Sequence, residues 1–530
     1  MKVISANEIG KIIHDGDMVG ISGSGGCGSP ETLLSALRNY FETTGHPKGI
    51  GVTCGITPGD KTTNYVGFNH LAVPGLVDLA ICSHLGRGKL FGQAVAQNQF
   101  AAYTIPLGVY GHLLRAIAGK KIGVLTTVGL NTYCDPRLEG CRANEKCTKD
   151  IVELVNIDGQ EQLLYRSFPI QVALIKASYA DVDGNVSLIH EPVIGEQKEL
   201  ASAVANSGGI VICEVDEILP RNKILPKNVD IFKKLVDYIV ISKKDYSLGD
   251  YNFPIFKPEL IGETIVEPEE IAPMPLNERK ICGRRACMEL KADDIVNLGI
   301  GMPDSVGVIA AEENFSKKIY ISIETGVFGG VPVYWSLFGA AINPIALYST
   351  CDIFDLYDGG IIDVAVLGLA EVDVFGNVNV SKINSRSTGP GGFINITQSS
   401  KKVIFIGTFT AHGLKVEIKD QKIKILKEGT IKKFKKNVQQ ITFASQYAVK
   451  TNQNILYITE RAVFQINSDG FLELIEIAPG IDLENDIIKQ MEFRPKIAKD
   501  LKLMDARLFQ EEKLHLEKYF QYGAHQDIFE

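Results

Sequence analysis

"GDMVGISGSGGCGSPETLLSALRNY", residues 16–40, contains a polar turn with an aspartate, an apolar strand, a glycine-rich loop with a proline, and an amphipathic helix pattern. The same order of features returns in "ADDIVNLGIGMPDSVGVIAAEEN", residues 292–314. Because the order occurs twice, we predict that the chain holds two copies of one unit of strands and helices.

Two further pairs of segments extend the repeat. "VALIKASYADVDGNVSL", 172–188, matches "VAVLGLAEVDVFGNVNV", 364–380, and "GGIVICEVDEI", 208–218, matches "KKVIFIGTFTA", 401–411. Between its matched points the first copy carries about 85 residues more than the second. The insertion therefore belongs to the first copy, upstream of residue 172.

The boundary between the copies is expected in "EPEEIAPMPLNERK", because linkers are often rich in proline and charge. The sequence thus predicts an N-terminal half over 1–266, a linker over 267–280 and a C-terminal half over 281–530. Strands alternate with helices in both copies, which favours an α/β fold of two tandem related halves, each a mainly parallel sheet flanked by helices. Ligands of such sheets bind at the carboxyl ends of the strands.

Composition excludes several classes of protein. The 530 residues are 45% hydrophobic and 22% charged, as in globular enzymes, and the net charge of −8 argues against a nucleic-acid partner. No apolar run reaches the roughly 18 residues of a membrane span, and the N-terminus lacks an apolar signal core. Ten cysteines form no CxxC pair, and nine histidines show no metal spacing. We expect a cytoplasmic enzyme without a metal or a membrane partner.

One carboxylate stands out in "IYISIETGVFGG", residues 319–330. Alternating isoleucines predict a strand, after which Glu324 enters a loop with three glycines. Most carboxylates at strand ends are simply solvated, and on position alone that interpretation is favoured. Its place at the carboxyl edge of a parallel sheet makes Glu324 a candidate site residue instead.

Glycine-rich loops lie at the same kind of edge. "GSGGCG" at 23–28 lacks the spacing of a dinucleotide fingerprint and is interpreted as a tight turn. "GIGMP" at 299–303 and "STGPGGF" at 387–393 could direct backbone N–H groups at an oxyanion. A carboxylate among such donors can act as a general base or as a nucleophile, and no Ser-His or Cys-His arrangement competes for the role.

Several ordered motifs carry a family resemblance from about residue 3 to about residue 510. They are "TTVGLNTYCDPRLEGCRANE", "NLGIGMP", "SIETG", "AEVDVFGNVNVSKIN", "GPGGFINIT" and "YITERAVF". Together they resemble the family I coenzyme A transferases, most of all the single-chain type typified by propionate and acetate CoA-transferases. The resemblance implies two fused α/β halves, in agreement with the repeat.

The resemblance also implies a mechanism. Glu324 would attack an acyl-CoA thioester and pass through a mixed anhydride to a glutamyl-CoA thioester, with ping-pong kinetics. The partners would be acyl-CoA and small carboxylic acids, with coenzyme A a substrate rather than a cofactor, and the assembly a homo-oligomer, a dimer or a tetramer. An acyl-CoA hydrolase that uses the same glutamate stays the alternative, whereas a non-catalytic binding protein of this fold would not need Glu324.

Further site residues follow from the matched motifs. Predicted contacts of coenzyme A and of the oxyanion come from two loops and one turn, namely Gly299, Gly301, Met302, Gly391, Gly392 and Asn377. For Asn377 a plain turn role is equally favoured, and for its counterpart Asn185 the turn is preferred. Glu460 could orient groups at the acyl pocket, although an ion pair with Arg461 is favoured.

Departures from the family pattern cluster in the first half. Leu107 and Gly108 stand where the family shows a glutamine followed by glycine, and Asn131, Tyr133 and Cys141 replace other family residues. Leucine offers an apolar surface in place of an amide, so we predict a preference for acyl groups longer than propionyl. The alternative is that Leu107 packs inside the first half. The single tryptophan, Trp335, is expected in the core or in a pocket wall.

Overall fold

The computed structural model describes residues 2–59, 62–243, 257–267, 273–333, 337 and 339–520. Trp335 and residues 268–272 of the predicted linker lie outside these ranges. The chain forms two compact units. Unit 1 comprises Met1–Val266, Glu324–Asp355 and Ser381–Asn395, and unit 2 comprises Glu267–Ile323, Leu356–Val380 and Ile396–Glu530. Two segments from the second half of the chain therefore pack with the first half.

Unit 1 is built on a parallel sheet with the strand order β1-β12-β11-β9-β2-β3-β4-β5, and β10 pairs with β9 in the antiparallel direction. The strands are β1 (Lys2–Val3), β2 (Met18–Ile21), β3 (Ile50–Ile56), β4 (Val77–His84), β5 (Ala101–Thr104), β9 (Val172–Asp181), β10 (Val186–Ser187), β11 (Ile210–Leu219) and β12 (Tyr238–Ile241). Most of the residues in these strands are apolar and buried, as expected for strands covered on both faces.

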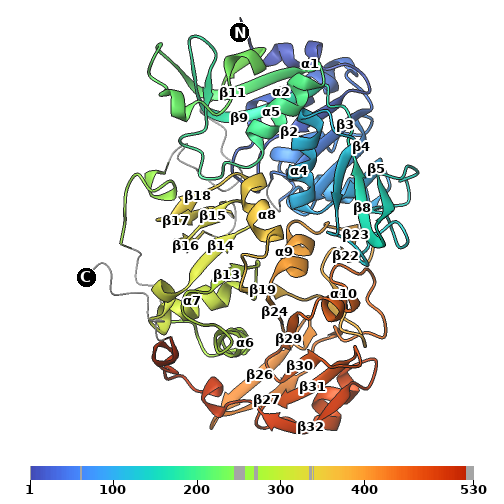
Figure 1. The fold of residues 1–530 in the computed structure, drawn as a ribbon, viewed down its shortest axis with the longest axis vertical. Helices are drawn as coiled ribbons and strands as arrows, with labels where there is room; N and C mark the ends of the chain where they lie inside the picture. Colours follow the sequence, from blue (N-terminus) through green and yellow to red (C-terminus); the bar gives the residue numbers. More distant parts are fainter. Residues whose placement is uncertain are drawn as a thin grey trace. The chain divides into compact units, whose positions relative to one another are not determined.

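Helices cover both faces of this sheet (Figure 1). Val19 and Ile21 of β2 join the core that contains Leu33 and Leu37, whereas Gly20 between them faces Leu200. The alternation along β2 thus separates the two helix layers. The helices are α1 (Ile9–Ile12), α2 (Glu31–Thr44) and α3 (Lys89–Ala96) on the first side, and α4 (Leu107–Ala118) and α5 (Gln197–Asn206) on the second.

Short strands complete unit 1. A three-stranded antiparallel sheet consists of β6 (Gly123–Thr126), β8 (Gln160–Arg166) and β7 (Val152–Ile157). Three antiparallel pairs of short strands are β15 (Val327–Phe328) with β18 (Ala346–Leu347), β16 (Val331–Pro332) with β17 (Ala341–Ile342), and β22 (Lys382–Ile383) with β23 (Arg386–Ser387).

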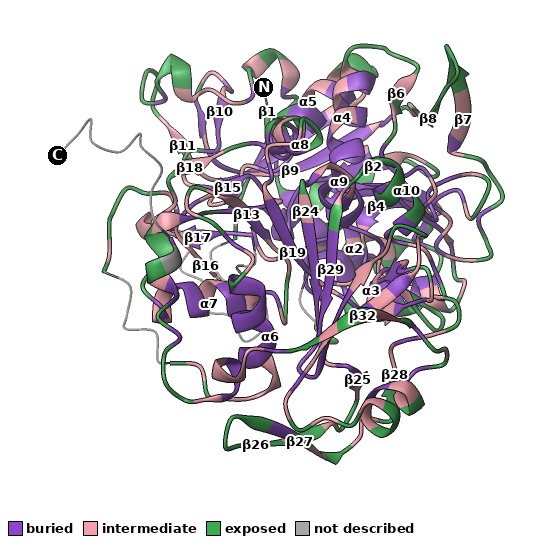
Figure 2. Ribbon diagram, turned by 60° about the horizontal axis from the view of Figure 1, so that its bottom comes forward, coloured by how far each residue is buried: buried purple, intermediate pink, exposed green. Residues whose placement is uncertain are grey.

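Unit 2 contains sheet strands in the order β14-β13-β19-β24-β29-β30-β31-β32, of which the first five are parallel. They are β14 (Tyr320–Ile323), β13 (Ile295–Leu298), β19 (Val364–Gly368), β24 (Lys402–Ile406), β29 (Asn454–Ile458), β30 (Ala462–Ile466), β31 (Leu472–Ile477) and β32 (Lys496–Leu503). Figure 2 shows β19, β24 and β29 as buried strands.

Helices and short strands accompany this second sheet. The helices are α6 (Glu278–Cys287), α7 (Asp304–Glu312) and α10 (Ser445–Lys450), while α8 (Thr350–Asp358) and α9 (Phe393–Ser399) each include residues of both units. The paired short strands are β20 (Glu371–Val372) with β21 (Val378–Asn379), β25 (Thr410–Ala411) with β28 (Ile431–Lys432), and β26 (Lys415–Lys419) with β27 (Lys422–Lys427).

The internal repeat is confirmed at the level of strand register. Val19 of β2 pairs with Val172 of β9, and Val296 of β13 pairs with Val364 of β19, in the register that the matched sequences require. The turns repeat as well. The Asp181 carboxylate accepts the backbone and side-chain N–H groups of Asn185, as the Asp373 carboxylate accepts those of Asn377. The α/β fold with a mainly parallel sheet in each copy is therefore confirmed.

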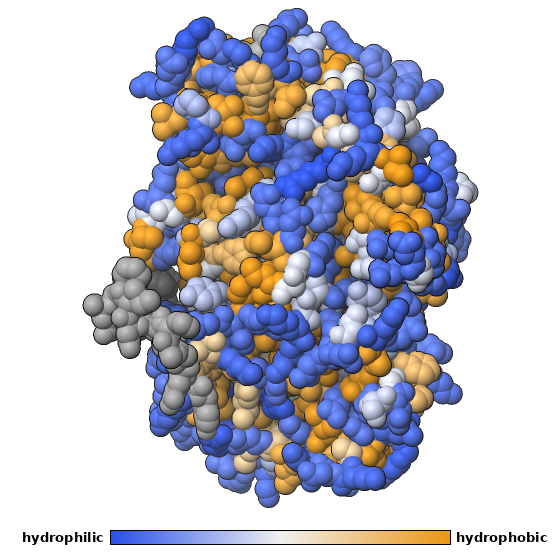
Figure 3. Space-filling model, viewed as in Figure 1, coloured by the Kyte–Doolittle hydropathy of each residue, from blue (hydrophilic) through white to orange (hydrophobic). Residues whose placement is uncertain are grey.

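The extra residues of the first copy form additional sheet structure. Between β3 and β9 unit 1 contains β4, α3, β5, α4 and the sheet β6-β8-β7, whereas the described residues from β14 to β19 contain short strands and α8. On the face drawn in Figure 3, hydrophilic side chains cover much of the surface, with hydrophobic ones between them. No helix of the described residues is long and apolar enough to cross a membrane.

Candidate active site

Glu324 directly follows β14 and begins the segment Glu324–Asp355 of unit 1. Its backbone position is fixed by Gly326, which has φ +107°, a conformation that glycine adopts at low cost. A Cβ at Gly326 would lie 2.0 Å from the carbonyl oxygen of Tyr348, and the Tyr348 N–H donates to the Gly326 carbonyl at 2.8 Å. Glycine at position 326 therefore allows the backbone to approach Tyr348 closely. The hydrogen bond between the two residues holds the start of the loop in place.

A second glycine loop meets the Glu324 carboxylate inside unit 1. The Gly392 N–H donates to Glu324 Oε2 at 2.8 Å. Gly391 has φ +53°, and a Cβ built on it would lie 3.6 Å from Glu324 Oε1. The structure thus brings together three predicted site residues, with a backbone donor on the carboxylate and no side chain between them.

The glycine loop is pinned to the ends of β4 and β5. The Leu85 N–H donates to the Thr388 carbonyl at 2.7 Å, and the Gly391 N–H donates to the Ser83 carbonyl at 3.3 Å. The Gly391 carbonyl accepts the Leu107 N–H at 2.9 Å and the Ser83 hydroxyl at 3.2 Å. These bonds hold the loop at the carboxyl edge of the parallel sheet, where ligands of such sheets bind.

An arginine that the sequence analysis missed acts on this carboxylate. Burial raises the pKa of Glu324 to about 7, while the Gly392 N–H and the charge of Arg87 oppose that rise. Arg87 is only 8% exposed and follows β4 in the loop "SHLGRGKL". The sequence signal that could have found Arg87 was a charged residue beside glycines directly after a buried strand, as for Glu324.

The glycine-rich loop of the first copy approaches the same arginine. Burial raises the pKa of the Cys27 thiol to about 12, with Glu191 adding to the rise and Arg87 reducing it. The Gly25 carbonyl accepts the Gly59 N–H at 2.9 Å, which ties this loop to the segment after β3. A buried thiol that stays protonated is a poor nucleophile, so Cys27 does not compete with Glu324.

The two candidate acyl-pocket residues at the start of α4 are buried. Leu107 is 1% exposed, and its Cδ1 lies 3.0 Å from the position of a Cβ on Gly55. The Gly108 N–H donates to Asn395 Oδ1 at 3.2 Å, and a Cβ on Gly108 would come within 2.6 Å of Phe354. The Leu107 side chain thus packs within unit 1, while its backbone supports the Gly391 loop.

The departures at Asn131, Tyr133 and Cys141 also lie in unit 1. Asn131 and Cys141 have φ +63° and +65°, and both belong to the turn region after β6. The buried Tyr133 hydroxyl donates to the Thr104 carbonyl at 2.9 Å at the end of β5. The Cys141 carbonyl accepts the Thr104 N–H at 2.9 Å, so Tyr133 and Cys141 support the end of β5.

The predicted coenzyme A loop over 299–303 belongs to unit 2. The Gly299 N–H donates to the Val366 carbonyl at 2.9 Å, and the Gly301 N–H donates to Asp304 Oδ2 at 3.1 Å. The Met302 carbonyl accepts the Ser305 N–H and hydroxyl. Both glycine N–H groups therefore have acceptors within unit 2, and the contact of this loop with coenzyme A stays a prediction.

Asn377 and Glu460 also belong to unit 2. Asn377 Oδ1 accepts the N–H and hydroxyl of Ser445, in addition to the turn contacts with Asp373. Glu460 is fully buried, pairs with Arg461 at 2.6 Å and accepts the Phe409 N–H at 2.8 Å. Asn377 thus has the contacts of a turn residue, and Glu460 has those of an ion pair with Arg461. Neither set of contacts requires a ligand.

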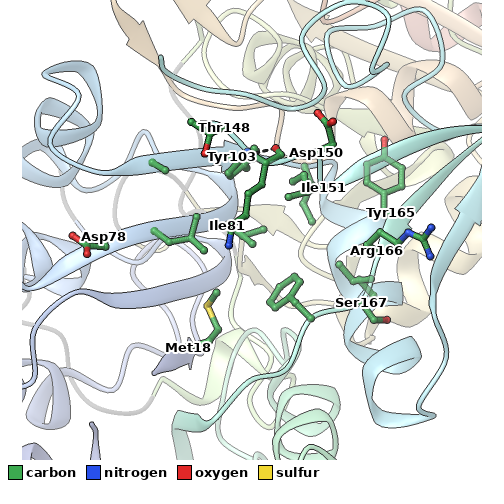
Figure 4. Close-up of a pocket in the computed structure, with 16 residues that line it drawn as sticks. Met18, Asp78, Ile81, Tyr103, Thr148, Asp150, Ile151, Tyr165, Arg166 and Ser167 are labelled. Atoms are coloured by element: carbon green, nitrogen blue, oxygen red, sulfur yellow. Dashed lines mark hydrogen bonds between the residues drawn. The ribbon is translucent and has the colours of Figure 1, made fainter. Parts of the chain in front are cut away.

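A cavity of about 370 Å³ lies elsewhere in unit 1 (Figure 4). Its walls include Met18 of β2, Ile81 of β4 and Tyr103 of β5 on one side and Tyr165 and Ser167 on the other. None of the candidate site residues lines it.

In the part of the chain that the structure describes, no group of three or more His, Cys, Asp or Glu side chains could hold a metal ion.

Comparisons with known proteins agree with this fold. The family model described as coenzyme A transferase matches residues 3–242. The caffeate CoA-transferase of Acetobacterium woodii is 44% identical over 96% of this chain and 98% of its own length. The acetate CoA-transferase YdiF of Escherichia coli strain K12 is 38% identical over 96% of this chain and 95% of its own length.

A solved structure is similar over the same extent. The acyl-CoA transferase YdiF of E. coli O157:H7, crystallised as a thioester complex with CoA, superposes with a TM-score of 0.90. It is 36% identical, and the match covers 97% of this chain and 96% of that one. The chain described here belongs to the coenzyme A transferase family.

Within that family it is an acyl-CoA:carboxylate CoA-transferase of the single-chain acetate type. The predicted family, enzyme class and α/β fold are thus confirmed. The domain boundaries, the homo-oligomeric state and the cytoplasmic location stay predictions.

Proposed function

We propose that Glu324 is the nucleophile of the transfer and that the reaction passes through a glutamyl-CoA thioester in a ping-pong sequence. The observation that carries this proposal is the half-buried Glu324 carboxylate, which accepts the Gly392 N–H at 2.8 Å and lies within the field of Arg87. The thioester complex of the similar E. coli enzyme supports it.

The proposed first half-reaction exchanges two carboxyl derivatives. A Glu324 carboxylate oxygen attacks the thioester carbonyl of acyl-CoA, the C–S bond breaks, and a mixed anhydride and the CoA thiolate result. The thiolate then attacks the glutamyl carbonyl, the acid leaves as a carboxylate, and glutamyl-CoA remains. A second carboxylic acid runs both steps in reverse. Because the thioester energy is conserved, the proposal needs no ATP, metal or redox cofactor.

The surroundings of Glu324 suit this role. A pKa near 7 leaves the carboxylate half ionised at neutral pH and mostly ionised at alkaline pH, yet poorly solvated and therefore reactive. The Gly392 N–H, already within hydrogen-bond distance of the carboxylate, is suited to donate to the oxyanion of a tetrahedral intermediate. One donor of this kind contributes about 3–4 kcal/mol in other enzymes.

The experiment looks for the covalent intermediate. The protein is incubated with acyl-CoA in the absence of an acceptor acid, and its peptides are then mapped by mass spectrometry. We expect an adduct of the mass of CoA on the peptide that contains Glu324, and Glu324→Gln should lose both the adduct and the transfer. Normal turnover by Glu324→Gln would overturn the mechanism. Release of free CoA and acid at the same rate with or without an acceptor would favour the hydrolase alternative.

A further inference from the structure

We propose that the cavity of unit 1 in Figure 4 is a second ligand site, which binds an apolar monocarboxylic acid with its carboxylate beside Lys149 and Ser167. The inference is independent of the proposed role of Glu324, because none of the lining residues belongs to the candidate active site. It concerns binding alone and adds no chemical step to the transfer reaction.

The floor of the cavity is one face of β4 and β5. Leu79 of β4 pairs in register with Ala101 of β5. Two residues further along, Ile81 pairs with Tyr103, so the four side chains share a face of the sheet. Leu113 of α4 lines the cavity as well. A volume of about 370 Å³ with mainly apolar walls and a few polar groups is typical of small-molecule sites.

One wall carries polar groups from two paired segments. β8 ends at Arg166, whose N–H donates to the Ile151 carbonyl at 3.1 Å, so the segments that contain these two residues lie side by side. The phenol of Tyr103 fixes the backbone of Lys149, because it accepts the N–H at 3.0 Å and donates to the carbonyl at 2.8 Å. Lys149 and Ser167 therefore line the cavity from neighbouring segments.

The Ser167 hydroxyl is the group that points to a ligand. Its oxygen is buried, and no described residue forms a hydrogen bond with it. The two phenols in the walls differ from it in this respect. Tyr165 donates to the Val128 carbonyl at 2.9 Å, and Tyr103 donates to the carbonyl of Lys149. A buried hydroxyl without a partner is unfavourable, so a ligand that supplies an acceptor to Ser167 removes that cost.

The charges at this wall favour an anion. Arg166 is already paired with Glu153 at 2.7 Å, and Asp150 is paired with Arg142. Lys149 is exposed and forms no ion pair with any residue that the structure describes. A carboxylate has two acceptor oxygens, so one group can accept from the ammonium and from a hydroxyl together.

An aspartate on the other side of the cavity orients the acid. Figure 4 shows Asp78 on one side of Ile81, and Tyr165 and Ser167 on the other. A ligand carboxylate near Asp78 would be repelled, whereas the same group beside Ser167 gains a donor. The apolar body then lies on the floor of β4 and β5. A second carboxylate on the ligand would meet Asp78, which is why the proposal is limited to monocarboxylic acids.

The test measures binding of 3-phenylpropionate and of octanoate to the full chain by isothermal titration calorimetry at low salt and about pH 7.5. The variants are Ala101→Phe, which fills part of the cavity, Ser167→Ala and Lys149→Gln. Lys146→Gln is the matched control, because Lys146 is an exposed lysine of the same loop that does not line the cavity. The alcohol 3-phenylpropanol is the neutral counterpart of the acid. Transfer from acetyl-CoA to propionate is measured for every variant as a check of the active site.

We expect saturable binding of the acids to the native protein and to Lys146→Gln, and none to Ala101→Phe, with transfer activity retained in all of them. Ser167→Ala should raise Kd by about three- to tenfold, the effect of losing one hydrogen bond. Lys149→Gln should raise Kd by about two- to fivefold, the effect of losing an exposed ion pair, and this difference should shrink at high salt. The alcohol should bind more weakly than the acid.

Several results would overturn the inference. Failure of both acids to bind the native protein would do so, and so would an unchanged Kd in Ala101→Phe, because the acid would then bind elsewhere, for example at Glu324. If Ala101→Phe does not fold, an unchanged Kd in both Ser167→Ala and Lys149→Gln is decisive against it. Equal affinity for 3-phenylpropanol would exclude a carboxylate as the recognised group.

Discussion

Replacing Glu324 by glutamine is expected to stabilise the fold at alkaline pH while it abolishes transfer. Burial raises the pKa of this carboxyl from 4.5 to about 7, so the folded protein retains the proton more strongly than the unfolded chain does. Glutamine has nearly the same shape, keeps an oxygen that accepts the Gly392 N–H, and carries no charge to desolvate. Keeping this carboxyl buried thus costs stability when it is ionised.

The magnitude follows from the two pKa values. Because the folded-state pKa is the higher one, the contribution of Glu324 to stability falls as the pH rises from about 4.5 through about 7. Each pKa unit corresponds to about 1.36 kcal/mol, which gives a total near 3 kcal/mol. Solvent that reaches the half-buried side chain reduces the effect, and we expect about 1–2 kcal/mol between pH 5.5 and pH 8.5.

The assay is reversible urea unfolding of the native protein and of Glu324→Gln at both pH values. The variant should be more stable than the native protein, and this difference in the free energy of unfolding should be larger at pH 8.5 than at pH 5.5. The increase between the two pH values should be about 1–2 kcal/mol. Glu145→Gln, on an exposed glutamate of unit 1, is the matched control and should show an equal difference at both pH values. The same gap between Glu324→Gln and native protein at both pH values would refute the reasoning.

Four further outcomes are expected. Under the proposed mechanism transfer requires ionised Glu324, so kcat/KM for acyl-CoA should rise about tenfold per pH unit below pH 7 and level off above it; a flat profile from pH 5.5 to 8.5 contradicts this. Gly391→Ala, at φ +53° in the loop that donates to the carboxylate, should strain that loop and lower kcat at least tenfold, whereas Gly470→Ala, at φ +77° with open space around it, should leave kcat unchanged; equal activities would show that backbone strain at Gly391 does not reach Glu324. Exhaustive chelation should leave activity intact, and a loss restored by a divalent ion would disprove metal independence. Leu107→Gln should shift the ranking of acyl-CoA substrates from butyryl toward acetyl, and an unchanged ranking means that Leu107 acts only in packing, as its contact with Gly55 suggests.

Local sequence determined the repeating unit of this protein. Strand and helix periods, the paired aspartate turns at Asp181 and Asp373, and the matched valines of β2 and β13 are properties of short segments, so they could be predicted without a structure. Glu324 was identifiable for the same reason, because an acid between a buried strand and a run of glycines is a local pattern.

Tertiary structure alone decided which loops meet. Ser83 and Gly391 are hydrogen-bonded although 308 residues separate them in the chain, and this contact places Arg87 beside the loop that serves Glu324. It also decided that Glu324–Asp355 packs with the first half of the chain and that the Gly301 N–H is engaged by Asp304. The physical reason is that hydrophobic periodicity fixes the direction and faces of each element, while the strand order and the hydrogen bonds between loops depend on how distant segments fit together in three dimensions.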